Sequence, residues 1–211
     1  MSLIEGLEKA RIIPLITLND AEDIIPVCEA LQNGGLKVAE VTFRTSAAED
    51  AIRLARKHFP DFIVGAGTVT TIGEVEQCKS AGAQFAIAPG LNPPVVQHAQ
   101  ELDLPFFPGV CTPTEVETAL ELGCTVLKFF PTIAMGGAAM LKSVYRPYQH
   151  RGVRFIPTGG ITEEDFADYL ALPFVVAVCG SWLTDKTLIE EKNWKKITDL
   201  THQALTIASK V

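Results

Sequence analysis

The chain has 211 residues, of which 47% are hydrophobic and 20% charged, a composition typical of a globular protein with a sizeable core. Its formal net charge of −7 argues against a nucleic-acid or membrane-surface partner, although a locally positive site can still bind an anionic small molecule. No apolar run reaches the roughly 18 residues of a membrane span, and the N-terminus is too charged for a signal peptide. The five cysteines include no CxxC pair, which indicates buried free thiols in a reducing cytoplasm.

Short apolar runs alternate with helical patterns along the whole chain. The runs, which predict strands, cover residues 11–18, 37–43, 61–67, 84–90, 104–109, 124–131, 153–160 and 174–180. Alternation of strand and helix predicts a parallel sheet, and eight such units in this length favour a compact (β/α)8 TIM barrel. A doubly wound open sheet is the alternative. We expect one domain over residues 1–211, with a short N-terminal helix within 1–12 and a closing helix over 193–205.

The predicted helices have recognisable start signals. The clearest is "TPTEVETALELG", where Thr112 can cap the helix, Pro113 fits its first position and Glu115 completes a capping box. Gly123 then supplies a left-handed stop. The same spacing of hydroxyl and acidic residues occurs at 46–49, 71–74 and 162–165.

Lys128 is the one charged residue of the apolar run "TVLKFFPT" (125–132). Burying an ammonium group among apolar side chains is costly, so its presence needs an explanation. In a barrel, reactive residues lie at the carboxyl ends of strands, where Lys128 falls, and a lysine held neutral in a dry pocket attacks carbonyl groups to form a Schiff base. The alternatives are pairing with a buried carboxylate or a side chain that extends to the rim.

The second strand carries polar residues in alternation, in "AEVTFRT". Glu40, Thr42 and Arg44 therefore share one face of that strand. Glu40 suits a general base, and Arg44 suits a bidentate clamp on a substrate carboxylate. Pairing of Glu40 with Arg44 is the structural alternative. Thr68, which ends "GAGT", would present its hydroxyl at the same rim.

The last two units contain glycines where a barrel commonly binds phosphate. "PTGGI" offers the N–H groups of Gly159 and Gly160, and "CGSW" offers Gly180 and Ser181 where a helix should begin, a position that favours anions. Two ordinary glycine turns are the alternative. The four histidines, scattered over helical or polar segments, are interpreted as surface residues and not as metal ligands.

Together, these stretches resemble the class I 2-keto-3-deoxy-6-phosphogluconate (KDPG) and 4-hydroxy-2-oxoglutarate (KHG) aldolases over nearly the whole chain. The matching segments are "EVTFRT", "GAGTV", "GAQFAIAPGL", "PGVCTPTE", "KFFP", "PTGGI" and "GSW". The resemblance implies a Schiff-base lysine at Lys128 and a proton shuttle at Glu40. It also implies contacts to the pyruvyl carboxylate from Arg44 and Thr68, and to phosphate from Thr158, Gly159, Gly160, Gly180 and Ser181.

The resemblance further implies an activity and an assembly. The family cleaves KDPG to pyruvate and glyceraldehyde 3-phosphate in the Entner–Doudoroff pathway, and KHG to pyruvate and glyoxylate. Its members are (β/α)8 barrels, usually homotrimers in the cytoplasm, and use no metal or organic cofactor. We therefore expect a phosphorylated keto-acid as the partner of this chain, with no nucleic acid and no membrane.

Three positions depart from the family pattern. Thr132 and Ile133 stand where the family commonly has alanine and glutamate, and Cys179 stands where glycine is frequent. These changes bear on the aldehyde half of the substrate more than on imine chemistry. Three alternatives stay open: a pyruvate aldolase for another aldehyde such as the 6-phosphogalactonate epimer, a phosphate-binding isomerase or synthase, and a non-catalytic sugar-phosphate-binding barrel.

Overall fold

The computed structural model describes all 211 residues and places a strand in each predicted apolar run. The strands are β1 (Ile12–Ile16), β2 (Val38–Thr42), β3 (Ile63–Gly67), β4 (Phe85–Ile87), β5 (Phe106–Phe107), β6 (Gly109–Val110), β7 (Val126–Phe129), β8 (Arg154–Pro157) and β9 (Val178–Gly180). The fifth run yields two short segments, β5 and β6, on either side of Pro108. Proline has no N–H group to donate to a neighbouring strand, which accounts for the interruption.

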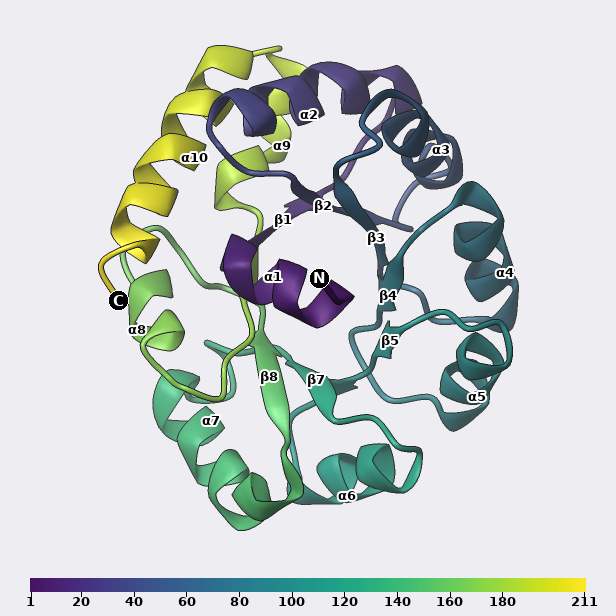
Figure 1. Cartoon of the computed structure of the whole chain (residues 1–211), viewed down its shortest axis with the longest axis vertical. Coiled ribbons are helices and arrows are strands. Elements are labelled where there is room, and N and C mark those ends of the chain that lie inside the picture. The colour runs from purple at the N-terminus through teal and green to yellow at the C-terminus, as the bar shows by residue number, and fades with distance from the viewer.

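All strand pairs are parallel, as the alternating pattern predicts. They form a six-stranded sheet in the order β5-β4-β3-β2-β1-β9 and a three-stranded sheet in the order β6-β7-β8. Isolated bridges between Phe155 and Val175 and between Thr158 and Cys179 connect the β8 segment with the β9 segment. In Figure 1 the strands surround the centre of the molecule, the helices lie outside them, and α1 crosses the middle of the view.

The helices follow the strands in the expected alternation. They are α1 (Leu3–Ala10), α2 (Ile24–Asn33), α3 (Ala48–His58), α4 (Ile72–Ala81), α5 (Pro93–Glu101), α6 (Pro113–Glu121), α7 (Gly137–Tyr145), α8 (Phe166–Leu170), α9 (Lys186–Glu190) and α10 (Trp194–Ala208). Three short 3-10 helices are η1 (Ala21–Asp23), η2 (Arg146–Arg151) and η3 (Trp182–Thr184). Helix α10, near the end of the chain, packs against α2, near its beginning (Figure 1). None of the helices has the length and apolar character needed to cross a membrane.

The predicted helix starts are correct in two cases and wrong in a third. Thr112 and Thr71 both cap their helices with complete capping boxes. Ser46 does not: α3 begins later, behind Ala47 and without a side-chain cap, and its Glu49 contacts Arg53 instead. The Arg53 guanidinium, one turn along the helix, takes the place of the backbone N–H group that the expected box would have supplied to Glu49. The fourth box, at 162–165, closes the turn that precedes α8.

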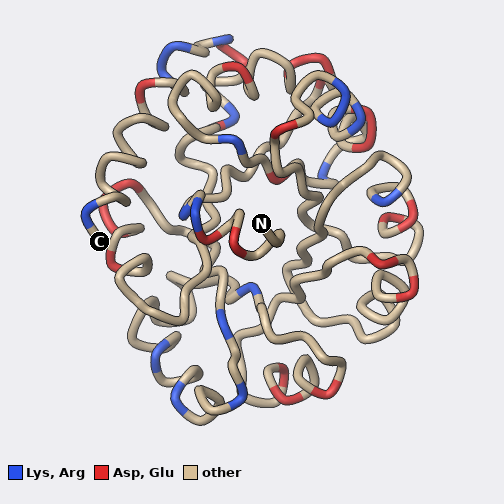
Figure 2. The backbone as a smooth tube through the Cα atoms, in the orientation of Figure 1, with Lys and Arg blue, Asp and Glu red and all other residues tan.

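Charged residues occur mainly on the outer helices and connections, as the colours of the backbone in Figure 2 show. The core contains 65 hydrophobic residues, and only seven polar or charged residues are buried with it. Five of those seven are threonines; the other two are Glu40 and Lys128. Because a buried charge is costly unless it is paired or has a function, these two residues mark the place to look for a site.

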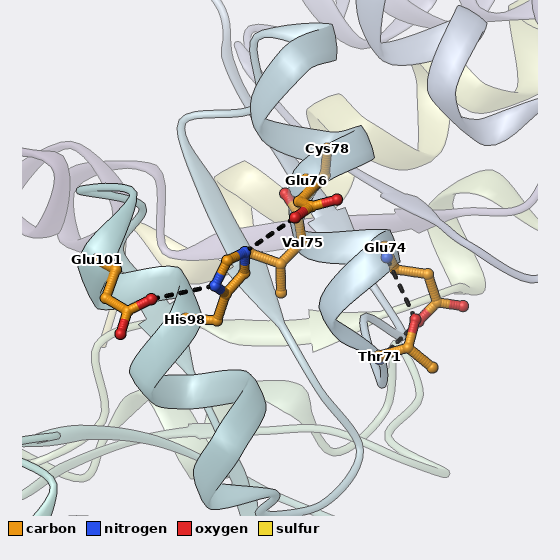
Figure 3. A network of polar contacts seen from close by, with 7 residues as sticks. All are labelled: Thr71, Glu74, Val75, Glu76, Cys78, His98 and Glu101. Carbon is orange, nitrogen blue, oxygen red and sulfur yellow. Dashed lines mark hydrogen bonds and ion pairs between the residues drawn. The ribbon is translucent and has the colours of Figure 1, made fainter.

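The histidines take no part in that interior. His58, His150 and His202 are exposed. His98 is half-buried between α4 and α5, where Nε2 lies 3.3 Å from Oε1 of Glu76 and Nδ1 lies 3.2 Å from Oε2 of Glu101. Figure 3 shows this contact together with the Thr71–Glu74 cap of α4. The group ties two outer helices together, which agrees with the interpretation of the histidines as surface residues.

Candidate active site

Lys128 lies in β7, paired in register with Gly109 on one side and Ile156 on the other. Its side chain is only 2% exposed, so it does not extend to the rim. No carboxylate lies within the 4.0 Å of an ion pair, so it is not a structural charge partner either. The neighbour that the structure gives to Nζ is the ring of Phe130, with the centroid 5.2 Å away. Both structural alternatives for Lys128 are therefore wrong, and its amine faces a cavity.

That cavity has a volume of about 580 Å³ and opens at the carboxyl ends of the strands. Most of the predicted site residues line it: Arg44, Lys128, Thr158, Gly159, Gly160, Gly180 and Ser181. Side chains that sequence reasoning missed also line it, namely Leu15, Thr17, Phe130, Ile161, Thr162, Trp182, Thr184, Asp185 and Lys186. Thr17 directly follows β1, so the rule that reactive residues follow barrel strands would have found it.

Glu40 and Thr68 are the two predicted residues that do not line the cavity. Glu40 is fully buried in β2, where its Oε2 accepts a hydrogen bond from Sγ of Cys179 at 3.0 Å. Its Oε1 has no hydrogen-bond partner. No ion pair joins Glu40 to Arg44, so the pairing considered from the sequence is wrong. A buried carboxylate with one free oxygen is well suited to accept a proton from a ligand.

Arg44 follows the end of β2 and is exposed at the cavity mouth. Its Nε donates a hydrogen bond to Oγ1 of Thr68 at 3.3 Å, so the two predicted residues are in contact. Thr68 adopts a φ of 59°, unusual for a residue with a branched side chain, directly after β3. Thr68 thus holds the guanidinium stem of Arg44, and the remaining N–H groups of Arg44 are available for a carboxylate.

The glycine loop after β8 offers unpaired N–H groups to the cavity. Gly159 and Gly160 have φ angles of 103° and 79°, a conformation that glycine tolerates without strain. The N–H groups of Gly159, Gly160 and Ser181 make no hydrogen bond within the chain. Thr158 differs, because its N–H group donates to the carbonyl of Phe129 and to Oγ1 of Thr132. The free donors of this loop pair are therefore the two glycines and Ser181.

Thr132 and Ile133, the two unusual residues after Pro131, do not line the cavity. Thr132 is fully buried, and its hydroxyl donates to the carbonyl of Phe129 at 2.8 Å while it accepts from the N–H group of Thr158 at 2.9 Å. Ile133 is 43% exposed and packs behind Gly160, with its N–H group donating to the carbonyl of Gly159. Both residues support the glycine loop from behind.

The parallel α/β fold and a buried, unpaired lysine at the floor of a cavity with free anion donors define a lysine-dependent enzyme that acts on carbonyl compounds. The model of the KDPG and KHG aldolase family matches residues 3–200. The chain belongs to this family. It is 46% identical over 205 residues to the 2-dehydro-3-deoxy-phosphogluconate aldolase of Haemophilus influenzae, which covers 97% of this chain and 96% of that protein.

Other relatives agree with this membership. The 2-dehydro-3-deoxy-phosphogluconate aldolase of Treponema pallidum is 44% identical over 207 residues, which cover 98% of each chain. A crystal structure of KDPG aldolase from Legionella pneumophila, with pyruvate captured at low pH as a covalent carbinolamine intermediate, superposes with a TM-score of 0.91 at 38% identity. The superposition covers 97% of this chain and 98% of that one.

Proposed function

We propose that this chain is a class I aldolase that cleaves KDPG to pyruvate and glyceraldehyde 3-phosphate. The observation that carries the proposal is Lys128, a buried amine with no carboxylate partner at the floor of the cavity. The deprotonated form of a lysine side chain is a nucleophile for a ketone. The names of relatives at 44–46% identity over nearly the full length support KDPG as the substrate.

Cleavage begins when the amine of Lys128 attacks the C2 ketone of KDPG, and loss of water gives a protonated imine. Glu40 accepts the proton of the C4 hydroxyl through a bridging water, the C3–C4 bond breaks, and its electron pair moves into the imine to form an enamine. Glyceraldehyde 3-phosphate leaves. Protonation of the enamine at C3 and hydrolysis of the imine then release pyruvate and restore Lys128.

The remaining residues fix the substrate at its two ends. Arg44, held by Thr68, binds the pyruvyl carboxylate and orients C2 toward Lys128. At the opposite end, Gly159, Gly160 and Ser181 donate N–H groups to the phosphate, with Thr158 and Gly180 shaping the same loops. The separation of these two anion sites selects a keto-acid that carries a phosphate at its far end.

KHG is the second substrate that we propose. A relative from Escherichia coli strain K12 named KHG/KDPG aldolase is 41% identical over 94% of this chain and 92% of that protein. KHG has the same C2 ketone and C4 hydroxyl as KDPG, so Lys128 and Glu40 would act on it in the same way. It lacks the phosphate, so we expect weaker binding.

The architecture that we propose is a single-domain, closed (β/α)8 barrel over residues 1–211. It is supported by the bridges between the β8 and β9 segments and by the adjacency of β5 and β6, which together join the two sheets.

We further propose a cytoplasmic homotrimer of the Entner–Doudoroff pathway that works without metal, organic cofactor, nucleic acid or membrane. Native mass spectrometry would test the trimer.

Trapping the imine tests the proposed chemistry. Incubation with pyruvate followed by borohydride reduction should add one pyruvyl group to the intact protein, and peptide mapping should place it on Lys128. Lys128→Ala should give no adduct and no cleavage of KDPG, whereas Lys195→Ala, at an exposed site on α10, should behave as wild type. Absence of an adduct at every pH between about 6 and 9, the range where a catalytic lysine is tuned to react, contradicts the proposal. An adduct without cleavage of KDPG or KHG would point to another aldehyde.

A further inference from the structure

Cys179 and Glu40 come from strands that flank β1 on opposite sides. Cys179 of β9 pairs with Ile13 of β1, and Glu40 of β2 pairs with Leu15 of the same strand. Both side chains are fully buried, and Sγ of Cys179 lies 3.0 Å from Oε2 of Glu40. The thiol therefore reaches past β1 to the carboxylate. It is the one hydrogen-bond donor that the chain supplies to that carboxylate.

The other oxygen of Glu40, Oε1, lies against Gly67 of β3. A methyl group on Gly67 of β3 would overlap Oε1, so the absence of a side chain there makes room for it. Oε1 is buried and has no partner within the chain. One oxygen of the carboxylate is thus occupied by the thiol, while the other stays free for a proton from the substrate.

We propose that Cys179 is a positioning residue for proton transfer, which fixes the Glu40 carboxylate through its thiol and leaves Oε1 free to accept the proton. The inference rests on the role of Glu40 in the proposed function. It gives a purpose to a fully buried thiol that the proposed reaction does not otherwise use. The bond also fixes the rotation of the carboxylate plane, and a misplacement of about 1 Å in a catalytic group can cost about a hundredfold in rate.

The environment of Cys179 keeps the thiol protonated, which a hydrogen-bond donor must be. Burial and the adjacent Glu40 carboxylate raise the pKa of Cys179 well above its ordinary value, while the Lys128 ammonium and the hydroxyl of Thr158 act in the opposite direction. A protonated thiol donates a hydrogen bond, whereas a thiolate beside the carboxylate would repel it. Cys179 therefore serves as a donor and not as a nucleophile.

Exchange of the methyl protons of pyruvate separates positioning from other effects. In deuterium oxide, the enzyme should convert the Lys128 imine to the enamine and back, replacing C3 protons with deuterium; this step needs the base but no aldehyde. Borohydride trapping on the same samples counts imine at Lys128. Substitution of a residue that only positions Glu40 should lower the rate of deuterium exchange and leave the amount of adduct at saturating pyruvate unchanged.

The variants are Cys179→Ala and Cys179→Gly, which remove the donor, and Cys179→Ser, which restores an O–H donor. We expect exchange to fall about tenfold in the first two, the loss typical of one hydrogen bond to a charged group, with adduct at the wild-type level. Cys179→Ser should recover most of the rate. Cys28→Ala, at a fully buried thiol of α2 outside the cavity, is the matched control and should exchange as wild type. Thermal unfolding of each variant checks that it is folded.

The outcomes distinguish this inference from the proposed function. Wild-type exchange in both Cys179→Ala and Cys179→Gly overturns the inference alone. So does a parallel loss of exchange and adduct, or a Cys179→Ser variant no better than Cys179→Ala, because either result assigns the thiol a packing role. If Glu40→Gln exchanges as fast as wild type, the assignment of Glu40 as the proton shuttle is wrong. If the wild type gives neither exchange nor adduct, the proposed function itself is wrong.

Discussion

Gly67 of β3 lies so close to Glu40 of β2 that a methyl group on Gly67 would overlap Oε1 of the glutamate. The two strands are parallel neighbours in register, with Thr42 opposite Gly67. A side chain at position 67 is therefore incompatible with the present position of the carboxylate. The requirement for glycine comes from the close approach of a functional group, since Gly67 has no left-handed φ.

We predict that Gly67→Ala displaces the Glu40 carboxylate and lowers KDPG cleavage by about a hundredfold, the loss expected for a catalytic group moved by about 1 Å. Trapping of the pyruvate imine should persist, because Lys128 lies on a different strand. Gly73→Ala is the control: a methyl group there meets no atom within 4 Å, so activity should be unchanged. Cleavage by Gly67→Ala at the wild-type rate would mean that the carboxylate position is not important.

Thr132 links β7 to the glycine loop through one hydroxyl, which both donates to Phe129 and accepts from Thr158. Thr132→Val keeps the shape and removes both bonds. We predict a decrease of about 2 kcal/mol in the free energy of unfolding, because the usual net value of a buried hydrogen bond is about 1 kcal/mol. Urea denaturation measures it, and Thr132→Ser, which keeps the hydroxyl, should lose less. Equal denaturation midpoints for Thr132→Val and wild type would contradict the predicted linking role.

Much of the fold follows from local patterns that the sequence displays openly. Each strand is a short apolar run, and Lys128 and Glu40 attract attention because a charge in such a run needs a reason. Helix starts are predicted where the cap is local, as at Thr112 and Thr71, and fail at Ser46, where Glu49 has a competing partner in Arg53.

The remaining features depend on register between strands that are distant in sequence. Cys179 and Glu40 are 139 residues apart, and only the pairing of both strands with β1 brings them into contact. The support of the glycine loop by Thr132 also arises from the meeting of two loops. Composition and periodicity carry no information about such contacts, so the sequence analysis notes Cys179 and Thr132 only as departures from the family pattern and does not explain them.

Lys186, at the start of α9, lines the cavity together with Gly159, Gly160 and Ser181. Its ammonium lies 3.4 Å from Glu190, and both side chains are more than half exposed. Exposed ion pairs contribute little, so the lysine is free to turn toward a phosphate. We predict that Lys186→Ala raises KM for KDPG about threefold, the effect of one exposed charge, without changing kcat.

The same substitution should leave KM for KHG unchanged, because that substrate has no phosphate. The increase for KDPG should shrink at high salt, since exposed charges are screened. Lys195→Ala, which removes an exposed lysine paired with Asp199 on α10, provides the charge-matched control. An equal change in KM for both substrates would show that Lys186 does not discriminate by the phosphate.

Cys28 and Cys78 make the stability of the fold sensitive to high pH. Burial, together with Glu29 near Cys28, raises the pKa of both thiols from 9.0 to about 12. Above pH 9.0 the unfolded chain releases these protons while the folded chain retains them, so the free energy of unfolding falls as the pH rises. Each thiol should remove about 1.4 kcal/mol per pH unit between the two pKa values.

We therefore predict that a Cys28→Ala, Cys78→Ala double variant loses less stability than wild type between about pH 8 and pH 10, a span that crosses the ordinary thiol pKa. Urea denaturation at each pH gives both free energies, and only their pH dependence is compared, because the lost packing of two side chains is the same at every pH. Cys111→Ala, at a half-buried thiol, should change the dependence less. Parallel curves for the double variant and wild type would show that Cys28 and Cys78 do not govern the loss of stability in alkali.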